Sequence, residues 1–265
     1  MHHGRLRGRL TDMIQFRANF FAETLGVSTS ATVLLPQRTS GQIGLAGTVR
    51  QHTPVLYLLH GYSDDDTIWL RRTSIERYAS DRGLAVVMPN AGTSFYCNEV
   101  YGRRYWDYVS QELPALVAEQ FTVSDAREDT FVAGLSMGGY GAFKLALRQP
   151  DRFAAAGSLS GCLDMATSPR SPRPDETVSP VWGDRPIAGT DDDLVHLVGQ
   201  ADVASLPRMW MTCGTEDQLV EHNRTFEAAA RSAGVDLVAD YQPGTHEWGY
   251  WDRTIQQFLD FAMEA

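Results

Sequence analysis

The chain has 265 residues, of which 43% are hydrophobic, and its formal net charge is −10. This length and composition predict one globular domain, residues 1–265, with a sizeable core. The acidic balance argues against nucleic acid as a partner, because phosphate binding needs clustered basic side chains. The densest group of arginines, Arg5, Arg7 and Arg9, is expected to be a solvated tail.

Apolar stretches and cysteines narrow the class of protein further. The sequence has no run of 18 apolar residues, so we expect no membrane-spanning helix, and polar residues interrupt the N-terminal segment where a secretory signal needs an apolar region. Three cysteines, Cys97, Cys162 and Cys213, are too few and too scattered for a disulfide framework or a zinc site. We therefore expect a cytoplasmic protein without a metal.

The first third of the chain predicts an antiparallel sheet edge followed by a parallel unit. Residues 13–35 alternate between apolar and polar with a break at Gly26, which predicts an antiparallel pair of strands. Residues 37–53 are polar and glycine-rich and predict a loop. Two continuous apolar runs, 55–59 and 84–88, predict strands buried on both faces. The helical spacing of 69–81 between them completes a β-α-β unit.

The alternation of strands and helices continues to the end of the chain. Further strands are expected at 130–134, 153–159, 208–212 and 236–241, and further helices at 105–121, 139–148, 225–232 and 255–263. In the first of these helices Pro114 marks either a first turn or a kink. The pattern predicts an α/β fold, with a doubly wound, mostly parallel sheet and an antiparallel N-terminal edge.

Residues 163–206 interrupt this pattern. They hold five prolines and the acidic run Asp191-Asp192-Asp193. We interpret the segment as a cap-like insertion over the carboxyl edge of the sheet, because such insertions often cover active sites. A surface loop without substrate contact is the alternative.

Gly134-Leu135-Ser136-Met137-Gly138 matches the G-x-S-x-G pattern. An apolar strand leads into it and an amphipathic helix follows, which is the setting that exposes a serine in a strained turn. Free N–H groups at the start of that helix favour developing negative charge. Ser136 is therefore the predicted nucleophile, and a tight turn that merely contains a serine is the alternative.

A serine hydroxyl needs a base to accept its proton. His246 lies in a glycine-containing loop between the last strand and the last helix, which suits the chain order serine, acid, histidine. His222 is expected at the surface, at a helix start. His196 lies in the segment 163–206 and is expected to be solvated, with contact to substrate as the alternative. His246 is therefore the predicted base.

The acid should follow the strand at 208–212, where Glu216 and Asp217 stand side by side. Either carboxylate can orient the imidazole and stabilise its charged form. We prefer Asp217, because the acid in this pattern stands a few residues beyond the strand end, and we expect Glu216 at the surface.

Residues 58–62 end the first buried strand, and in this fold that loop supplies one N–H group of an oxyanion hole, while the residue after the nucleophile supplies the other. The expected donors are Tyr62 and Met137, with Gly61 as the alternative to Tyr62. His60 is expected to be a structural hydrogen-bonding residue. The run Asp64-Asp65-Asp66 is explained more simply as a helix N-cap near Thr67 than as a metal site.

Several motifs in order resemble one known family. They are His60-Gly61-Tyr62, Trp69-Leu70-Arg71-Arg72-Thr73, Val87-Met88-Pro89-Asn90, Gly134 to Gly141 and Gly244-Thr245-His246-Glu247-Trp248. Over roughly residues 13–262 the chain resembles the esterase D family of α/β-hydrolases, and within it the tributyrin esterase branch. The resemblance implies the α/β-hydrolase fold and a serine carboxylesterase that hydrolyses short acyl esters, acetyl to butyryl, without metal or organic cofactor.

The resemblance also bears on residues and partners. Ser136, Asp217 and His246 fall on the family's triad positions, and Tyr62 and Met137 on its oxyanion positions. Because members often form homo-oligomers, a homo-oligomer is possible here. The wider family includes S-formylglutathione hydrolases, feruloyl and acetylxylan esterases and acyltransferases, which use the same triad and remain alternatives.

Aromatic residues near these motifs are candidates to line the substrate pocket. We single out Trp69, Trp182 and Trp248, and expect about two of the chain's aromatic candidates to touch a small-molecule ester. A catalytically inactive binding protein is the remaining alternative from another class, and the presence of all three triad residues argues against it.

Overall fold

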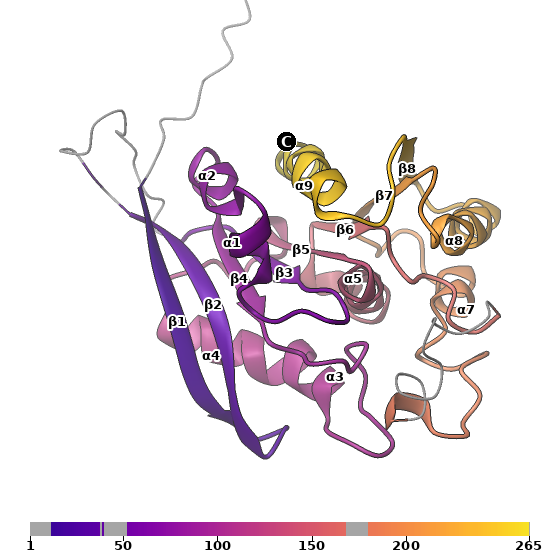
Figure 1. Cartoon of the computed structure of the whole chain (residues 1–265), viewed down its shortest axis with the longest axis horizontal. Helices are drawn as coiled ribbons and strands as arrows, with labels where there is room; N and C mark the ends of the chain where they lie inside the picture. Colours follow the sequence, from indigo (N-terminus) through magenta and orange to yellow (C-terminus); the bar gives the residue numbers. More distant parts are fainter. Residues whose placement is uncertain (1–11, 38, 40–51, 168–179, 265) are drawn as a thin grey trace, which may run out of the picture.

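A computed structural model describes residues 12–37, 39, 52–167 and 180–264. Within these ranges eight strands form one sheet in the order β1-β2-β4-β3-β5-β6-β7-β8 (Figure 1). The strands are β1 (Asp12–Ala22), β2 (Val27–Gln37), β3 (Val55–Leu59), β4 (Ala85–Pro89), β5 (Thr130–Leu135), β6 (Ala155–Leu159), β7 (Arg208–Gly214) and β8 (Leu237–Gln242). Most of the loop expected at 37–53 lies outside the described residues.

The pairing of the strands matches the hydrophobic pattern. β1 and β2 are antiparallel, and so are β2 and β4, whereas the pairs from β4 through β3 to β8 are parallel. β3 and β4 are buried along their whole length, as their continuous apolar runs require. The predicted mostly parallel sheet with an antiparallel N-terminal edge is confirmed.

Helices cover both faces of the sheet (Figure 1). The helical segments are α1 (Ile68–Arg72), α2 (Ile75–Ser80), α3 (Tyr105–Asp107), the π-helix η1 (Tyr108–Glu112), α4 (Leu113–Gln120), η2 (Arg127–Asp129), α5 (Met137–Arg148), η3 (Pro150–Arg152), α7 (Leu194–Gly199), α8 (Val220–Ser232) and α9 (Trp248–Met263). α1, α2 and α9 pack with one buried cluster, and α3, α4, α5, α7 and α8 pack with the other. The sheet is thus doubly wound, and none of the helices described could cross a membrane.

The helix expected at 69–81 is in fact two helices. Thr73, between α1 and α2, is extended, and its hydroxyl accepts the N–H of Ile75. The N–H of Ser74 donates to the Asp252 carboxylate of α9 at 3.0 Å. Because these polar groups offer the backbone other partners, the helix breaks there and α2 docks against α9.

The segment at 105–121 is helical but irregular. Pro114 has no N–H to donate to the carbonyl of Ser110, four residues before it, and a π-helical turn stands at that point. The freed Ser110 carbonyl accepts from the side chains of Arg152 and Gln149 instead. Both readings of Pro114 therefore hold in part: it stands at the first turn of α4, and it distorts the helix before it.

Polar contacts tie the described part of the segment 163–206 to helix α5, while 168–179 lie outside the described residues. Lys144 of α5 forms an ion pair with Asp192. The indole N–H of Trp182 donates to the same carboxylate at 2.9 Å, and the Tyr140 hydroxyl donates to the Asp192 carbonyl at 2.7 Å. These bonds fasten residues 180–199 against the helix that begins at the predicted nucleophile.

Candidate active site

Ser136 stands in the sharp turn between β5 and α5. Its φ of 53° and ψ of −115° are strained for a residue with a side chain. A Cβ at Gly134 would lie 2.4 Å from the Gly138 backbone, and a Cβ at Gly138 would lie 2.4 Å from the Leu59 carbonyl oxygen. Only glycine fits at both positions, so the G-x-S-x-G pattern follows from close packing of this turn against β3.

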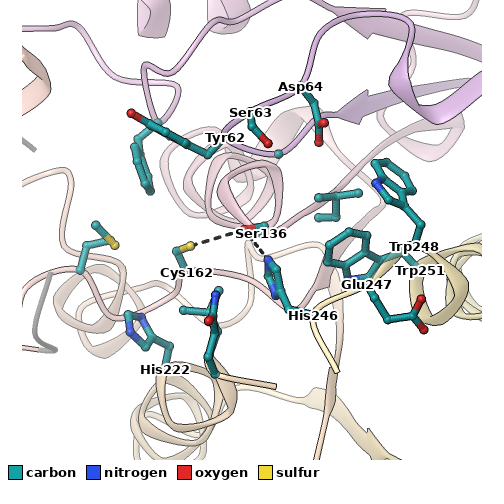
Figure 2. A pocket seen from close by; sticks show the side chains of 16 residues that line it. Tyr62, Ser63, Asp64, Ser136, Cys162, His222, His246, Glu247, Trp248 and Trp251 are labelled. Carbon is teal, nitrogen blue, oxygen red and sulfur yellow. Dashed lines mark hydrogen bonds between the residues drawn. The ribbon is translucent and has the colours of Figure 1, made fainter. Parts of the chain in front are cut away.

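Three loops at the carboxyl ends of parallel strands bring Ser136, His246 and Asp217 together (Figure 2 shows the first two). Oγ of Ser136 lies 3.1 Å from Nε2 of His246. Nδ1 of His246 lies 2.9 Å from Oδ2 and 3.1 Å from Oδ1 of Asp217. These distances allow the imidazole to accept the serine proton while its other nitrogen donates to the carboxylate.

The Asp217 carboxylate is suited to stabilise a charged imidazole. Its side chain is fully buried, and Oδ1 also accepts the N–H of Leu219 at 2.8 Å. Burial raises the pKa of the carboxyl, but the hydrogen bond and charge of His246, together with the Leu219 N–H, outweigh burial and lower the pKa overall. Asp217 is therefore ionised at neutral pH.

Glu216 forms hydrogen bonds with the loops around the site and none with the imidazole of His246. Its Oε2 accepts the N–H of Gly244 at 2.7 Å, and Oε1 accepts the Thr215 hydroxyl at 2.8 Å. The Gly244 N–H is the main cause that lowers the pKa of this exposed carboxyl. The structure thus brings Asp217 to His246, while Glu216 holds the loop that carries His246.

The imidazole of His246 rests against Trp251 of α9. The two rings meet edge to face with centroids 4.8 Å apart, and the indole N–H donates to Oγ of Ser160 at 3.2 Å. The indole therefore has a fixed position and limits rotation of the imidazole.

His60 is a buried hydrogen-bonding residue, as expected. Nδ1 lies 2.7 Å from the Gly61 carbonyl, and Nε2 accepts the N–H of Ala91 at 2.9 Å. Burial lowers the pKa of the imidazole, so the ring is neutral and donates from Nδ1. The Tyr96 hydroxyl donates to the His60 carbonyl at 2.9 Å, which fixes the backbone just before Tyr62.

Tyr62 and Met137 are the residues expected to donate their N–H groups to an oxyanion, and this assignment stays a prediction. Tyr62 lines the cavity around Ser136, and so does Gly61. Met137 begins α5 directly after Ser136, and the first N–H groups of a helix have no partner within the helix.

The three aspartates at 64–66 have three different roles. Asp65 accepts the N–H of Thr67 at 2.9 Å, which matches the expected helix start. Asp66 is buried and accepts the hydroxyls of Ser30 and Thr32 at 2.8 and 2.7 Å. Asp64 lines the cavity, and burial raises the pKa of its carboxyl. Across the described ranges no three His, Cys, Asp or Glu side chains are grouped to hold a metal ion.

A cavity of about 860 Å³ opens over Ser136 and His246 (Figure 2). Trp248 and Trp251 line it. Trp69 does not line it, because this residue is 1% exposed and its indole N–H donates to the Leu59 carbonyl at 3.1 Å. Its ring packs edge to face against that of Trp248, with the ring centroids 5.5 Å apart. Trp182 is also buried and does not line the cavity. Its ring packs against that of the lining residue Phe95, with the ring centroids 5.3 Å apart. Of the three tryptophans singled out as pocket residues, only Trp248 lines the cavity.

The cavity contains residues that sequence patterns did not point to. Sγ of Cys162 lies 3.8 Å from Oγ of Ser136, and Met165 and His222 also line the cavity. The prediction that His222 lies at the surface is wrong, because its exposed fraction is 8%. α8 begins at Val220, earlier than the expected 225, so His222 shares the buried face of this helix with Phe226. Residues four positions apart share one face of a helix, so the spacing of His222 and Phe226 was the sequence signal that His222 is buried.

Comparison with known proteins agrees with this geometry. Residues 22–261 match the esterase family described as "Putative esterase". The chain is 28% identical to an acetyl esterase of Caldicellulosiruptor saccharolyticus over 96% of this chain and 99% of that protein.

Two solved structures from Staphylococcus aureus are also similar, each with 33% identity over 96% of this chain and 100% of the other. They are fluorophosphonate-binding serine hydrolase F with substrate bound, with a TM-score of 0.86, and an S-formylglutathione hydrolase, with a TM-score of 0.82. The chain therefore belongs to this esterase family and is a serine ester hydrolase with the α/β-hydrolase fold.

Proposed function

We propose that the protein is a carboxylesterase that hydrolyses short-chain acyl esters through an acyl-enzyme on Ser136. The observation that carries this proposal is the chain of contacts from Oγ of Ser136 through His246 to Asp217, in which Ser136 and His246 line a cavity. A serine hydroxyl is a weak nucleophile alone, and this arrangement supplies both the base and the group that orients it.

In the proposed mechanism Ser136 attacks the ester carbonyl while Nε2 of His246 accepts its proton. The N–H groups of Tyr62 and Met137 stabilise the negative oxygen of the tetrahedral intermediate. His246 then protonates the departing alcohol, and the same residue activates a water that hydrolyses the acyl-enzyme. Asp217 stays ionised throughout and stabilises the imidazolium.

The preference for acetyl to butyryl groups has two supports. The ring of Trp251 touches the His246 imidazole, and the ring of Trp248 packs on that of Trp251. Both rings line the cavity next to the triad, so their bulk leaves room there only for a small acyl group. The similarity to an acetyl esterase points the same way. Assignment to the tributyrin esterase branch is part of this proposal.

The test is a series of p-nitrophenyl esters from acetyl to dodecanoyl. We expect kcat/KM to peak at acetyl to butyryl, whereas a peak at C10 or longer would refute short-chain specificity. Labelling of Ser136 by a fluorophosphonate probe, absent in Ser136→Ala, tests the nucleophile separately.

An S-formylglutathione thioesterase is the second candidate, because one similar solved structure carries that name. A thioester places sulfur where the ester has its alcohol oxygen, and the same triad can expel it. Parallel assays on S-formylglutathione and p-nitrophenyl acetate decide between them: a kcat/KM at least tenfold higher on the thioester favours the thioesterase. Added alcohol, with analysis of transesterified product, tests the acyltransferase alternative in the same experiment.

The arrangement of the whole chain is also a proposal. We propose one domain with 163–206 as a cap-like insertion, because Met165 lines the cavity and Trp182 supports Phe95 at its wall. The cytoplasmic location and the homo-oligomer stay predictions.

A further inference from the structure

One side of the cavity holds a buried histidine that the proposed mechanism does not use. Figure 2 shows His222 on the opposite side of the Ser136–His246 pair from Trp248 and Trp251. We call this side the His222 lobe, and Figure 2 places Tyr62 and Cys162 there with His222. Three further lining residues are next to these: Phe95 packs against Tyr62, Met165 follows Asp164, which is bonded to His222, and Leu219 caps the helix of His222.

The hydrogen bonding of His222 determines which of its nitrogens carries the proton. The backbone N–H of Asp164 donates to Nδ1 at 3.4 Å, so Nδ1 is an acceptor. Burial lowers the pKa of the imidazole, and this effect is larger than that of the Asp164 and Asp217 charges, which raise the pKa. The ring is therefore neutral near pH 7. A neutral ring that accepts at Nδ1 carries its proton at Nε2.

That Nε2–H group has no protein acceptor among the residues the structure describes. His222 is 8% exposed, and the surface it retains belongs to the cavity wall. Of the other side chains that line the cavity, those of Phe95, Met165 and Leu219 have no oxygen. Among the described residues, neither the Tyr62 hydroxyl nor the Gln218 amide forms a hydrogen bond with His222, although both line the cavity. Burial raises the pKa of the Cys162 thiol to about 12, so this side chain stays an uncharged thiol. The Nε2–H group therefore faces the cavity, where a ligand that supplies an acceptor can form the hydrogen bond.

We propose that His222 determines specificity by donating its Nε2–H to an oxygen of the substrate, so that preferred esters carry an ether, hydroxyl or carbonyl oxygen where a plain ester carries a methylene. This inference rests on the proposed esterase function and adds a substrate class to it. A site built to hydrogen-bond an oxygen discriminates against the isostere that lacks it.

The oxygen can belong to the acyl group or to the alcohol, and two isosteric ester pairs distinguish these sources. The acyl pair is p-nitrophenyl methoxyacetate and p-nitrophenyl butyrate. The alcohol pair is 2-methoxyethyl acetate and butyl acetate. For each pair the ratio of kcat/KM, oxygen-bearing over alkyl, is measured in the wild type and in variants, so that intrinsic differences in reactivity cancel.

We expect His222→Leu to lower this ratio by about 3- to 10-fold on one of the two pairs, as expected for loss of one neutral hydrogen bond. The pair that responds identifies which part of the substrate enters the His222 lobe. His222→Gln, which keeps an N–H donor, should restore part of the ratio. The matched control is His196→Leu, because His196 is exposed on α7, and it should leave both ratios unchanged.

Ratios that are the same in wild type and His222→Leu on both pairs would overturn the inference but leave the esterase proposal standing. A wild type inactive on all four esters would overturn both. Thermal unfolding at the wild-type temperature verifies that a variant is folded, and fluorophosphonate labelling of Ser136 verifies that its nucleophile is intact. If His222→Leu fails this check, His222→Met provides the donor-free variant.

Discussion

The ammonium group of Lys144 is buried on α5, the helix that follows Ser136, and forms an ion pair with the carboxylate of Asp192. The Lys144 side chain is 1% exposed, and Nζ also donates to Sγ of Cys97 at 2.9 Å. The pair joins α5 to the segment 163–206 at a point where Asp192 also binds Trp182. Since Lys144 is two turns along the helix from Ser136, the same helix holds both the nucleophile and Asp192 of the segment 163–206.

Asp192→Asn should therefore destabilise the protein strongly. Removing one partner leaves the buried ammonium without its counter-charge, which costs about 3–5 kcal/mol in the free energy of unfolding. The matched control is Asp191→Asn, because the neighbouring Asp191 is 71% exposed and pairs with Arg148, so its loss should cost about 0–1 kcal/mol. Urea denaturation of the three proteins measures both values, and equal losses would contradict the buried-pair account.

The same ion pair predicts a dependence of stability on pH. Burial raises the pKa of Asp192, but the charge and hydrogen bond of Lys144 outweigh burial and lower the pKa overall. A carboxyl whose pKa is lower in the folded than in the unfolded protein stabilises the folded protein at every pH above its unfolded-state pKa of about 3.9. That stabilisation is lost as the pH falls from there through the lower, folded-state pKa. The difference in unfolding free energy between wild type and Asp192→Asn should thus be constant from pH 7 to 5 and shrink below about pH 4. A difference independent of pH from 7 to 3 would show that charge is not the cause.

Ser136→Ala should lower kcat by about 10⁶ on a p-nitrophenyl ester, because both covalent steps of the mechanism need its oxygen. His246→Ala should cost about as much, and the double variant should cost little more, since the two residues act as one unit. Steady-state kinetics on the three proteins measure this. Losses that multiply in the double variant would contradict a shared proton-transfer step.

Asp217→Asn should lower kcat by about 10⁴, because the amide cannot hold the imidazole in the required tautomer. Glu216→Gln is the matched control from the adjacent position: it affects only the Gly244 N–H and the Thr215 hydroxyl, so we expect a loss of less than about tenfold, within the range of one neutral hydrogen bond. If Glu216→Gln abolished activity while Asp217→Asn left it intact, the assignment of the acid would be wrong.

Gly138→Ala should destabilise the turn by about 1–3 kcal/mol and reduce activity, because the added Cβ would lie 2.4 Å from the Leu59 carbonyl oxygen. Gly199→Ala offers a comparison, since a Cβ there meets no atom within 4 Å. Thermal unfolding and kcat/KM should change in the first variant and not in the second. An unaffected Gly138→Ala would refute the steric explanation of the motif.

Local patterns in the sequence were enough to predict the fold class and the nucleophile turn. Strand burial follows from continuous apolar runs such as 55–59, and the turn at Ser136 follows from glycines two positions away on each side. These features depend on neighbours along the chain, and so a short window contains the information. The break of the helix at Thr73, by contrast, depends on Asp252, which is 178 positions from the Ser74 that it binds.

By itself the sequence determined the order of the strands, the strained serine turn and the loop that carries His246, because periodicity and close backbone packing act over a few residues. Only the tertiary structure decided that Asp217 rather than Glu216 meets the imidazole, that His222 faces the cavity and that Trp182 does not. Those outcomes depend on the register of β7 against β8, on where α8 begins and on contacts between distant segments. Side-chain direction at loop ends is set by such long-range packing, which no local pattern contains.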